Sequence, residues 1–214
     1  MTLSPIEARV LGVLIEKQLT TPNQYPMSVN ALQSGSNQKS NRDPVVKYSE
    51  GDVLDGLDGL RRHKLAGTHD GVVSRVPKYR HLLNRRFELK LRDTAVLCTL
   101  LLRGPQTLGE IRSRTNRMFD FRSLEEVAAT LEGLAKNEPA LVTKLPRRPG
   151  QKDDRYAQLL TGKPKPEAYA ASTTPAASAS SASSGNLPAR VDALERTVAE
   201  LQAELSRLKT ALGE

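Results

Sequence analysis

The chain has no tryptophan, one cysteine, three histidines and few aromatic residues, which make up 4% of its 214 residues. A single cysteine cannot form an intrachain disulfide, and Cys98, within the apolar run VLCTLLL, is best interpreted as a buried thiol in a reducing cytoplasm rather than a reactive one. No run approaches the ~18 apolar residues that a membrane helix needs. Because the first residues, MTLSPIEARV, lack a basic and then apolar leader pattern, we expect a cytoplasmic protein without membrane contact.

Catalytic and metal-binding patterns are also missing. The three histidines (His63, His69 and His81) are scattered, and none pairs with a cysteine at a zinc-ligand spacing. The sequence contains no P-loop, no dinucleotide-binding glycine pattern after a strand and no nucleophile elbow. Asp55 and Asp58 could share a helix face, but such carboxylates usually form a solvated surface. We therefore expect no metal, no cofactor and no enzymatic activity.

Positive charge is what the sequence has in excess. The formal net charge is +8, and residues 161–214 contain six Lys+Arg and six Asp+Glu, so the whole excess lies in residues 1–160. A basic globular region indicates an acidic partner, and nucleic acid is the commonest one. Sparse aromatic residues make single-strand binding by base stacking a weak option.

The basic region contains an internal repeat. Four blocks recur in the same order, and the apolar residues of the second block recur at i, i+4 and i+7, as on one face of a helix. The matched pairs are VLGVLI (10–15) with VLCTLL (96–101), EGDVLDGLDGL (50–60) with LEEVAATLEGL (124–134), VSRVP (73–77) with VTKLP (142–146), and KYRHLL (78–83) with RYAQLL (155–160).

Each copy is predicted to contain three helices followed by two strands. Ser4, Ser28, Thr107 and Ser123 stand where they can cap helices, and the third block supplies the first strand of each hairpin. Three helices and a hairpin form the winged-helix plan, a helix-turn-helix variant. We therefore predict a mainly α, α+β chain with two tandem winged-helix domains that pack on each other. The predicted segments are a first domain (4–83), a basic connector (84–90), a second domain (91–160), an Ala/Ser/Pro linker (161–186) and a coiled-coil helix (187–212).

In each final strand the tyrosine is expected to pack on the helices, with the flanking Lys or Arg in solvent; direct contact with a ligand is the alternative.

Four further stretches resemble one family. TTPNQYPMSVNAL (20–32), SNQKSNRDPV (36–45), LLLRGPQTLGEIRSRTNRMF (100–119) and PRRPGQKDDRY (146–156) are similar to the YceH-type family of uncharacterised bacterial tandem winged-helix proteins. The resemblance covers about residues 3–160. It implies the fold, and it implies little about function because the role of that family is not established.

The C-terminal tail is predicted to dimerise. Residues 161–186 contain almost no large apolar side chains, as in a flexible linker. After them, valine at a and leucine at d of successive heptads favour a two-stranded parallel homodimer. A lone helix that folds back on the domains is the alternative. The predicted dimerisation residues are Val191, Leu194, Val198, Leu201, Leu205 and Leu208.

Three basic or polar groups are the candidate contacts to double-stranded DNA, because amides, hydroxyls and cations contact phosphates and base edges. The alternatives are local turn chemistry for the first group and a solvated hairpin loop for the third. The groups are a polar loop (Asn37, Gln38, Lys39, Ser40, Asn41 and Arg42), residues on and after the second helix of copy two (Arg112, Arg114, Arg117 and Arg122), and a wing tip (Arg147, Arg148 and Lys152). Copy two has about eight more residues than copy one between the proline and the tyrosine.

The third helices carry the opposite charge. A DNA duplex bears about one negative charge per 1.7 Å, so acidic helices are repelled from its major groove. The hypotheses are a DNA-associated protein held through wings and second helices, or an adaptor that binds another protein through these acidic helices. The acidic residues are Glu50, Asp52, Asp55 and Asp58 in copy one, and Glu125, Glu126 and Glu132 in copy two.

Overall fold

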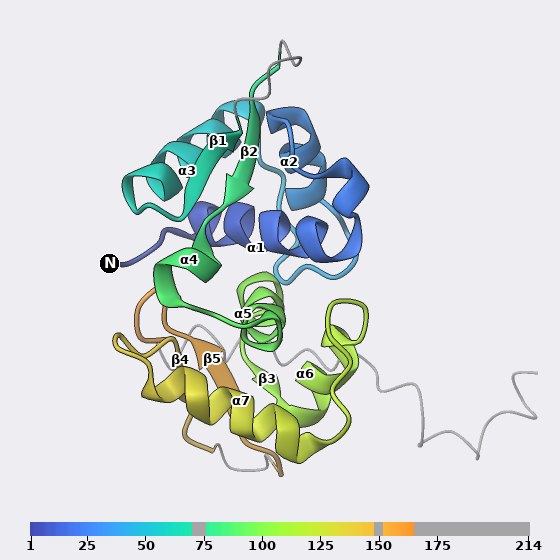
Figure 1. Ribbon diagram of the computed structural model, residues 1–214, viewed down its shortest axis with the longest axis vertical. Coiled ribbons are helices and arrows are strands. Elements are labelled where there is room, and N and C mark those ends of the chain that lie inside the picture. The colour runs from blue at the N-terminus through green and yellow to red at the C-terminus, as the bar shows by residue number, and fades with distance from the viewer. Residues whose placement is uncertain (70–75, 148–151, 165–214) are drawn as a thin grey trace, which may run out of the picture. The chain divides into compact units, whose positions relative to one another are not determined.

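The computed structural model describes residues 1–69, 76–147 and 152–164, all within one unit that spans Met1–Ala170. Figure 1 shows its helices and short strands. The first lobe contains α1 (Pro5–Thr20), a 3-10 turn (Pro22–Gln24), α2 (Val29–Ser36), α3 (Glu50–Arg62), β1 (Ala66–His69) and β2 (Lys78–His81). A short helix, α4 (Leu83–Phe87), leads to the second lobe, which contains α5 (Leu91–Arg103), β3 (Gln106–Thr107), α6 (Leu108–Thr115), α7 (Leu124–Lys136), β4 (Val142–Lys144) and β5 (Arg155–Gln158).

The helices α1, α2, α6 and α7 begin at the predicted caps. Ser4 accepts from the backbone of Glu7, whose carboxylate accepts from Ser4 N at 2.6 Å, so the predicted capping box is confirmed. Thr107 and Glu110 form the same reciprocal pair. At α7 only half of the box forms, because the Glu126 carboxylate accepts from Arg122 N at 3.0 Å instead. The fold is mainly helical with small antiparallel sheets, as predicted.

The two lobes have the same element order, and their sheets match. In the first lobe β1 pairs with β2 and brings Thr68 opposite Tyr79; in the second β4 pairs with β5 and brings Lys144 opposite Tyr156. The second sheet has an additional edge strand, β3, which pairs with β5. The first lobe has only a single bridge at that place, between Met27 and Tyr79. Tyr79 is buried while Lys78 and Arg80 are exposed, as expected of β2. In β5 Tyr156 is half-buried and Arg155 donates to Glu110 Oε2 at 3.1 Å, so the expectation that the flanking basic residue lies in solvent is wrong there.

One predicted strand was misplaced. The sequence favoured a strand at 73–77, but the strand that pairs with β2 is Ala66–His69, and Val76 and Pro77 lie in no strand; residues 73–75 are outside the described part. AGTH has no alternating apolar pattern, so its pairing depends on the tertiary position of the segment after α3. The connections between paired strands, 70–77 and 145–154, therefore differ in length by two residues, although the spacing between the proline and the tyrosine differs by about eight.

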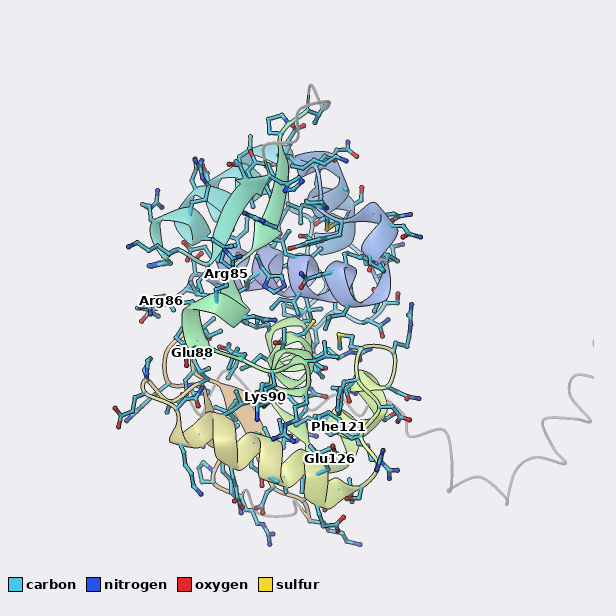
Figure 2. The ribbon with its side chains drawn as sticks, in the orientation of Figure 1. Arg85, Arg86, Glu88, Lys90, Phe121 and Glu126 are labelled. Carbon is cyan, nitrogen blue, oxygen red and sulfur yellow. The ribbon has the colours of Figure 1, made fainter. Side chains whose placement is uncertain are left out.

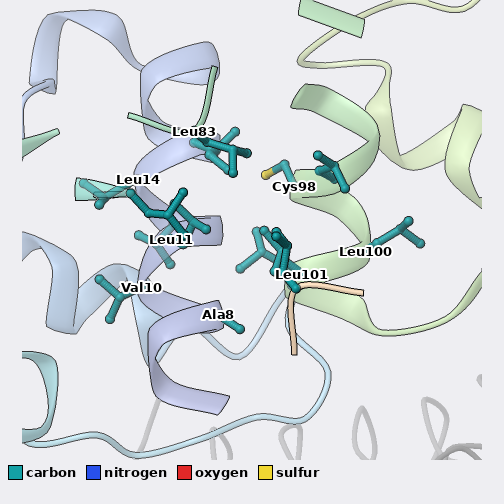
Figure 3. Close-up of a cluster of buried hydrophobic side chains, with 14 of the residues drawn as sticks. Ala8, Val10, Leu11, Leu14, Leu83, Cys98, Leu100 and Leu101 are labelled. Atoms are coloured by element: carbon teal, nitrogen blue, oxygen red, sulfur yellow. The ribbon is translucent and has the colours of Figure 1, made fainter. Parts of the chain in front are cut away.

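The lobes share one core, as predicted. α1 crosses α5, and Leu11, Leu83, Cys98 and Leu101 meet between the two helices (Figure 3). The Cys98 Sγ lies 3.4 Å from the Gly12 carbonyl oxygen, and burial raises the pKa of this thiol, so the expectation of a buried thiol is confirmed. Backbone bonds also join the lobes: Asp43 N donates to Leu102 O at 2.9 Å and Leu3 N to Leu160 O at 2.7 Å.

Candidate nucleic-acid interface

Two adjoining cavities lie where the first lobe meets the second. The smaller, of about 300 Å³, is bounded by the end of α1, the loop after α2, α5 and α6. The larger, of about 440 Å³, continues along α1 and the same loop. Both are lined by Glu16, Thr20, Asn41 and Arg117. We call the combined depression the basic groove, after its cations Lys17, Lys39, Arg103, Arg114 and Arg117.

Within the described part of the chain, three of these five cations have no acidic partner. Lys17 pairs with Glu16 and Arg114 with Glu110, each at 3.5 Å. Among the described residues, no carboxylate lies within 4.0 Å of Lys39, Arg103 or Arg117. The Arg103 guanidinium instead donates to the neutral side chain of Asn41. The groove therefore holds positive charge that the described residues do not pair.

The cations also act on one another. Burial lowers the pKa of Arg103, and the positive charges of Arg114 and Arg42 lower it further, whereas Asp43 and Glu16 oppose the shift. An anion in the groove would relieve this repulsion, because it stabilises the charged form of each neighbouring guanidinium.

Arg42 does not belong to the exposed surface that the sequence predicted. Its side chain is fully buried, and its guanidinium donates to both Glu16 carboxylate oxygens, at 3.1 and 2.6 Å. It also bonds the Gly35 and Asn41 carbonyl oxygens and Gln38 Oε1. The prediction of an exposed nucleic-acid contact at Arg42 is therefore wrong. A buried arginine ties the loop to α1 because a buried charge requires a partner.

The rest of the polar loop divides between local bonding and exposure. Asn37 donates to Tyr48 O at 2.8 Å and accepts from Tyr48 N at 2.7 Å, so its amide ties the start of the loop to a backbone segment eleven residues away. Asn41 has a φ of 59°, a left-handed conformation that asparagine tolerates. Lys39 and Ser40 are exposed and line the larger cavity.

The second predicted group is split as well. Arg114 and Arg117 line the basic groove. Arg112 instead donates to the carbonyl oxygens of Phe121 and Arg122, at 3.1 and 3.0 Å, and so holds the turn between α6 and α7. Figure 2 marks Phe121 at this turn. Arg122 lies beside it, outside the groove.

The predicted wing, the connection between β4 and β5, carries partly paired charge. Arg147 contacts Asp154 through two nitrogens, at 2.5 and 3.2 Å, and Lys144 contacts the same carboxylate at 2.6 Å. The hydrogen bond from Arg147, and after it the bond from Lys144, lower the pKa of Asp154 to about 2. Lys152 is exposed, and Arg148 lies outside the described residues. At the wing, therefore, one carboxylate already contacts two cations.

A further cavity, of about 550 Å³, lies between the connector and α7. Figure 2 labels Arg86, Glu88 and Lys90, which follow one another along this connector. Its lining contains three cations, Arg86, Lys90 and Arg92, and three carboxylates, Glu88, Asp93 and Glu138. The predicted basic connector, 84–90, is partly helical, because α4 covers Leu83–Phe87.

The acidic third helices present their carboxylates to solvent. On α3 the side chains of Glu50, Asp52, Asp55 and Asp58 are exposed, and on α7 those of Glu125 and Glu132 are exposed. The opposite faces are the predicted apolar stripes, which are at most 2% exposed: Val53, Leu57, Leu60, Val127, Leu131 and Leu134. α3 and α7 therefore face solvent with the charge that a DNA duplex repels.

Several predicted features lie outside the described residues, including the whole coiled-coil segment with its dimerisation residues and all but 161–164 of the linker. Within the described part, no group of three or more His, Cys, Asp or Glu side chains could hold a metal ion. In the same residues no helix is long and apolar enough to cross a membrane.

The comparisons with known proteins place this helical chain in a family. Residues 3–151 match the family described as "Protein of unknown function, DUF480". The chain is 49% identical over 212 residues to "UPF0502 protein VPA1223" of Vibrio parahaemolyticus, covering 97% of this chain and 94% of that one. It is 53% identical over 165 residues to a "UPF0502 protein" of Geotalea daltonii, covering 77% and 75%.

The chain therefore belongs to the DUF480/UPF0502 family of uncharacterised bacterial proteins, and the resemblance to such a family is confirmed. The family description assigns no catalytic activity.

Sequence reasoning missed two cations of the groove, Lys17 and Arg103. Both lie in the last turn of a helix, where a basic residue complements the helix dipole. That position is a common reason for a lysine or arginine, so nothing in the sequence around them signals a shared site. The meeting of the α1 and α5 ends is a property of the tertiary packing.

Proposed function

We propose that the protein is a tandem winged-helix protein that binds double-stranded DNA through its phosphate backbone, with a regulatory or architectural role and no catalysis. The observation that carries the proposal is the basic groove. Lys39 follows α2 and Arg117 follows α6, and although they are far apart in sequence they line the same cavity. Five cations gather in this depression, and three of them have no carboxylate partner among the described residues, which favours a polyanionic ligand.

The element order of each lobe supports the winged-helix part of the proposal. Three helices precede an antiparallel strand pair in both lobes, with α2–α3 and α6–α7 as the helix-turn-helix units. We propose 4–83 and 91–160 as the two domains. In this arrangement the acidic α3 and α7 stay out of the major groove. The duplex would lie along the basic groove, and Arg122, Arg147, Arg148 and Lys152 would add phosphate contacts outside the groove.

We also propose that residues 187–212 form a parallel coiled-coil homodimer, joined to the lobes by the linker 161–186. Val191, Leu194, Val198, Leu201, Leu205 and Leu208 would form its seam. A dimer would present two basic grooves to one duplex, which raises the overall affinity through effective concentration.

A salt titration tests DNA binding. For two duplexes of unrelated sequence, the association constant should fall with salt at a slope of about 0.9 per phosphate neutralised. Lys39→Glu and Arg117→Glu should each weaken binding to both duplexes equally and flatten the slope by about one. Arg61→Glu is the matched control, because Arg61 is exposed, pairs with Asp58 and lies on the acidic α3. If the unmodified chain bound neither duplex at low salt, where electrostatic attraction is greatest, the DNA proposal would fail.

The second candidate function is a protein adaptor that binds through the third helices. One observation favours it: Leu54 on α3 and Leu124 on α7 are 40% and 42% exposed among the acidic residues. An apolar side chain ringed by carboxylates fits a basic protein partner. If duplex binding fails, a partner retained by the full chain and lost with Leu54→Lys or Leu124→Lys would support the adaptor.

A further inference from the structure

We propose that the smaller cavity of the basic groove is a discrete phosphate pocket, which takes one phosphate group between Arg103, Arg114 and Arg117. The inference deepens the proposed function and rests on it only for the source of the phosphate. A backbone phosphate of DNA is one source, and a small phosphorylated molecule is the other.

The donors come from three separate segments. Arg103 ends α5, Arg114 lies in the last turn of α6 and Arg117 follows it, while Asn41 approaches from the loop after α2. A guanidinium presents a planar fork of N–H donors that suits phosphate oxygens. Arg103 is oriented by its bond to Asn41 before a ligand arrives, whereas Arg114 has only the looser contact with Glu110 at 3.5 Å.

One carboxylate, Glu16, also lines the cavity, and it would repel a phosphate if it were unpaired. The buried Arg42 contacts both of its oxygens, so the pair as a whole is neutral. The Arg42 hydrogen bonds and charge outweigh burial and keep the pKa of Glu16 below its usual value, so the pair stays ionised. Arg42 is thus a positioning residue: it neutralises the carboxylate that lines the cavity, so that Arg103 and Arg117, which have no carboxylate partner among the described residues, can act on the ligand together with Arg114.

Size and lining favour phosphate over a base. A cavity of about 300 Å³ is at the lower limit of ligand pockets and is far too small for a duplex. Its apolar lining is Leu102 and Met118, and the described residues around it include no aromatic side chain on which a base could stack. Ser113 and Thr20 add hydroxyls at the wall. Such a lining recognises one charged, oxygen-rich group and leaves the remainder of the ligand outside.

The test is calorimetric titration of the full-length protein with inorganic phosphate, at constant ionic strength maintained with chloride. We expect saturable binding, weakened about tenfold or more by Arg103→Gln, because a charge-assisted hydrogen bond contributes roughly 1.5–3 kcal/mol. Arg103→Lys keeps the charge without the fork and should bind with intermediate affinity. Arg61→Gln, on the exposed face of α3, should bind phosphate like the unmodified chain. Urea unfolding of each variant confirms that it folds.

Three further arms separate the possible outcomes: a mononucleotide, a 20-base-pair duplex and the same duplex with the Arg103→Gln chain. Phosphate binding without duplex binding supports the pocket, assigns it to a small phosphorylated ligand and removes the DNA function. Duplex binding that Arg103→Gln weakens, together with phosphate binding, supports both. If inorganic phosphate does not bind, or binds equally to the Arg103→Gln chain, the phosphate pocket is refuted. If the duplex binds the Arg103→Gln chain as tightly as the unmodified chain, the DNA function stands without the pocket.

Discussion

Packing between the lobes can be tested at one glycine. Gly12 is buried in α1, and a Cβ placed on it would lie 2.7 Å from Leu102 Cδ2 and 2.9 Å from Leu102 Cγ on α5. Leu102 is 3% exposed and cannot move into solvent without cost. Overpacking a core costs about 1–3 kcal/mol, while replacing glycine by alanine within a helix gains up to about 1 kcal/mol. We therefore expect Gly12→Ala to lower the free energy of unfolding by up to about 2 kcal/mol.

Gly133 is the matched control, because it also lies inside a helix and a Cβ added to it would meet no heavy atom of the described residues within 4 Å. Gly133→Ala should raise the free energy of unfolding by about 0.5–1 kcal/mol. Urea denaturation measures both variants, with an unchanged m value as the sign that unfolding remains comparable.

A double-mutant cycle isolates the contact. Leu102→Ala alone should cost about 2–5 kcal/mol, but it removes the atoms that the new methyl group would meet. In that background Gly12→Ala should become neutral or stabilising, which gives a coupling of about 1–3 kcal/mol. If Gly12→Ala stabilised the unmodified chain as Gly133→Ala does, the close approach of α1 and α5 would be refuted.

Three other perturbations have defined outcomes. Arg42→Gln leaves Glu16 without its buried partner and should lower the free energy of unfolding by about 3–5 kcal/mol in urea denaturation; a loss below about 1 kcal/mol would contradict the buried pair. Burial lowers the pKa of His81 from 6.5 to about 4 in the folded protein, so as the pH falls the unfolded chain takes up a proton at a higher pH than the folded chain. The free energy of unfolding should therefore fall by roughly 2 kcal/mol from pH 7 to pH 5. A His81→Gln chain should lose this dependence, and an identical pH profile would contradict it. Leu201→Glu should convert a dimer to a monomer in light scattering by placing a charge in the seam, and a monomeric unmodified chain would remove the coiled coil.

The helices could be predicted from the sequence because their signals are local. A capping serine or threonine and an apolar residue every three or four positions mark α1, α2, α6 and α7 without reference to the rest of the chain, whereas Leu82 and Lys90 stand at the cap positions of α4 and α5. Leu57 and Leu131 illustrate this, since both were predicted to face the core and both are 1% exposed. The internal repeat also predicted that each lobe would contain three helices followed by two strands.

The strands were harder because their pairing is set by tertiary contacts. β1 contains Gly67, has no alternating pattern and is placed by the end of α3, where Leu65 N bonds Leu60 O at 2.8 Å. β3 has only two residues, Gln106 and Thr107, too few for any periodicity. The alternation of apolar and polar residues at 73–77 was therefore mistaken for the first strand.

Several residues of the candidate site were predicted from the sequence, but their meeting in one groove was not. Composition and position drew attention to Lys39, Arg114 and Arg117, and the structure brings these three to one groove. The same reasoning chose Arg42, whose buried contacts with Glu16 have no sequence signature, because the partners lie 26 residues apart on different elements. A basic residue in a polar loop looks the same in sequence whether it faces solvent or neutralises a buried acid.

The basic groove takes its cations from both lobes. Lys17 and Lys39 belong to the first lobe and Arg103, Arg114 and Arg117 to the second, so neither lobe alone contains the full set. The contact between α1 and α5 sets the distance between these two groups of cations. A change at Gly12 or Leu102 that shifts the helices should therefore alter anion affinity as well as stability, although neither residue is charged. The proposed binding and the interlobe packing would then be coupled through the same pair of helices.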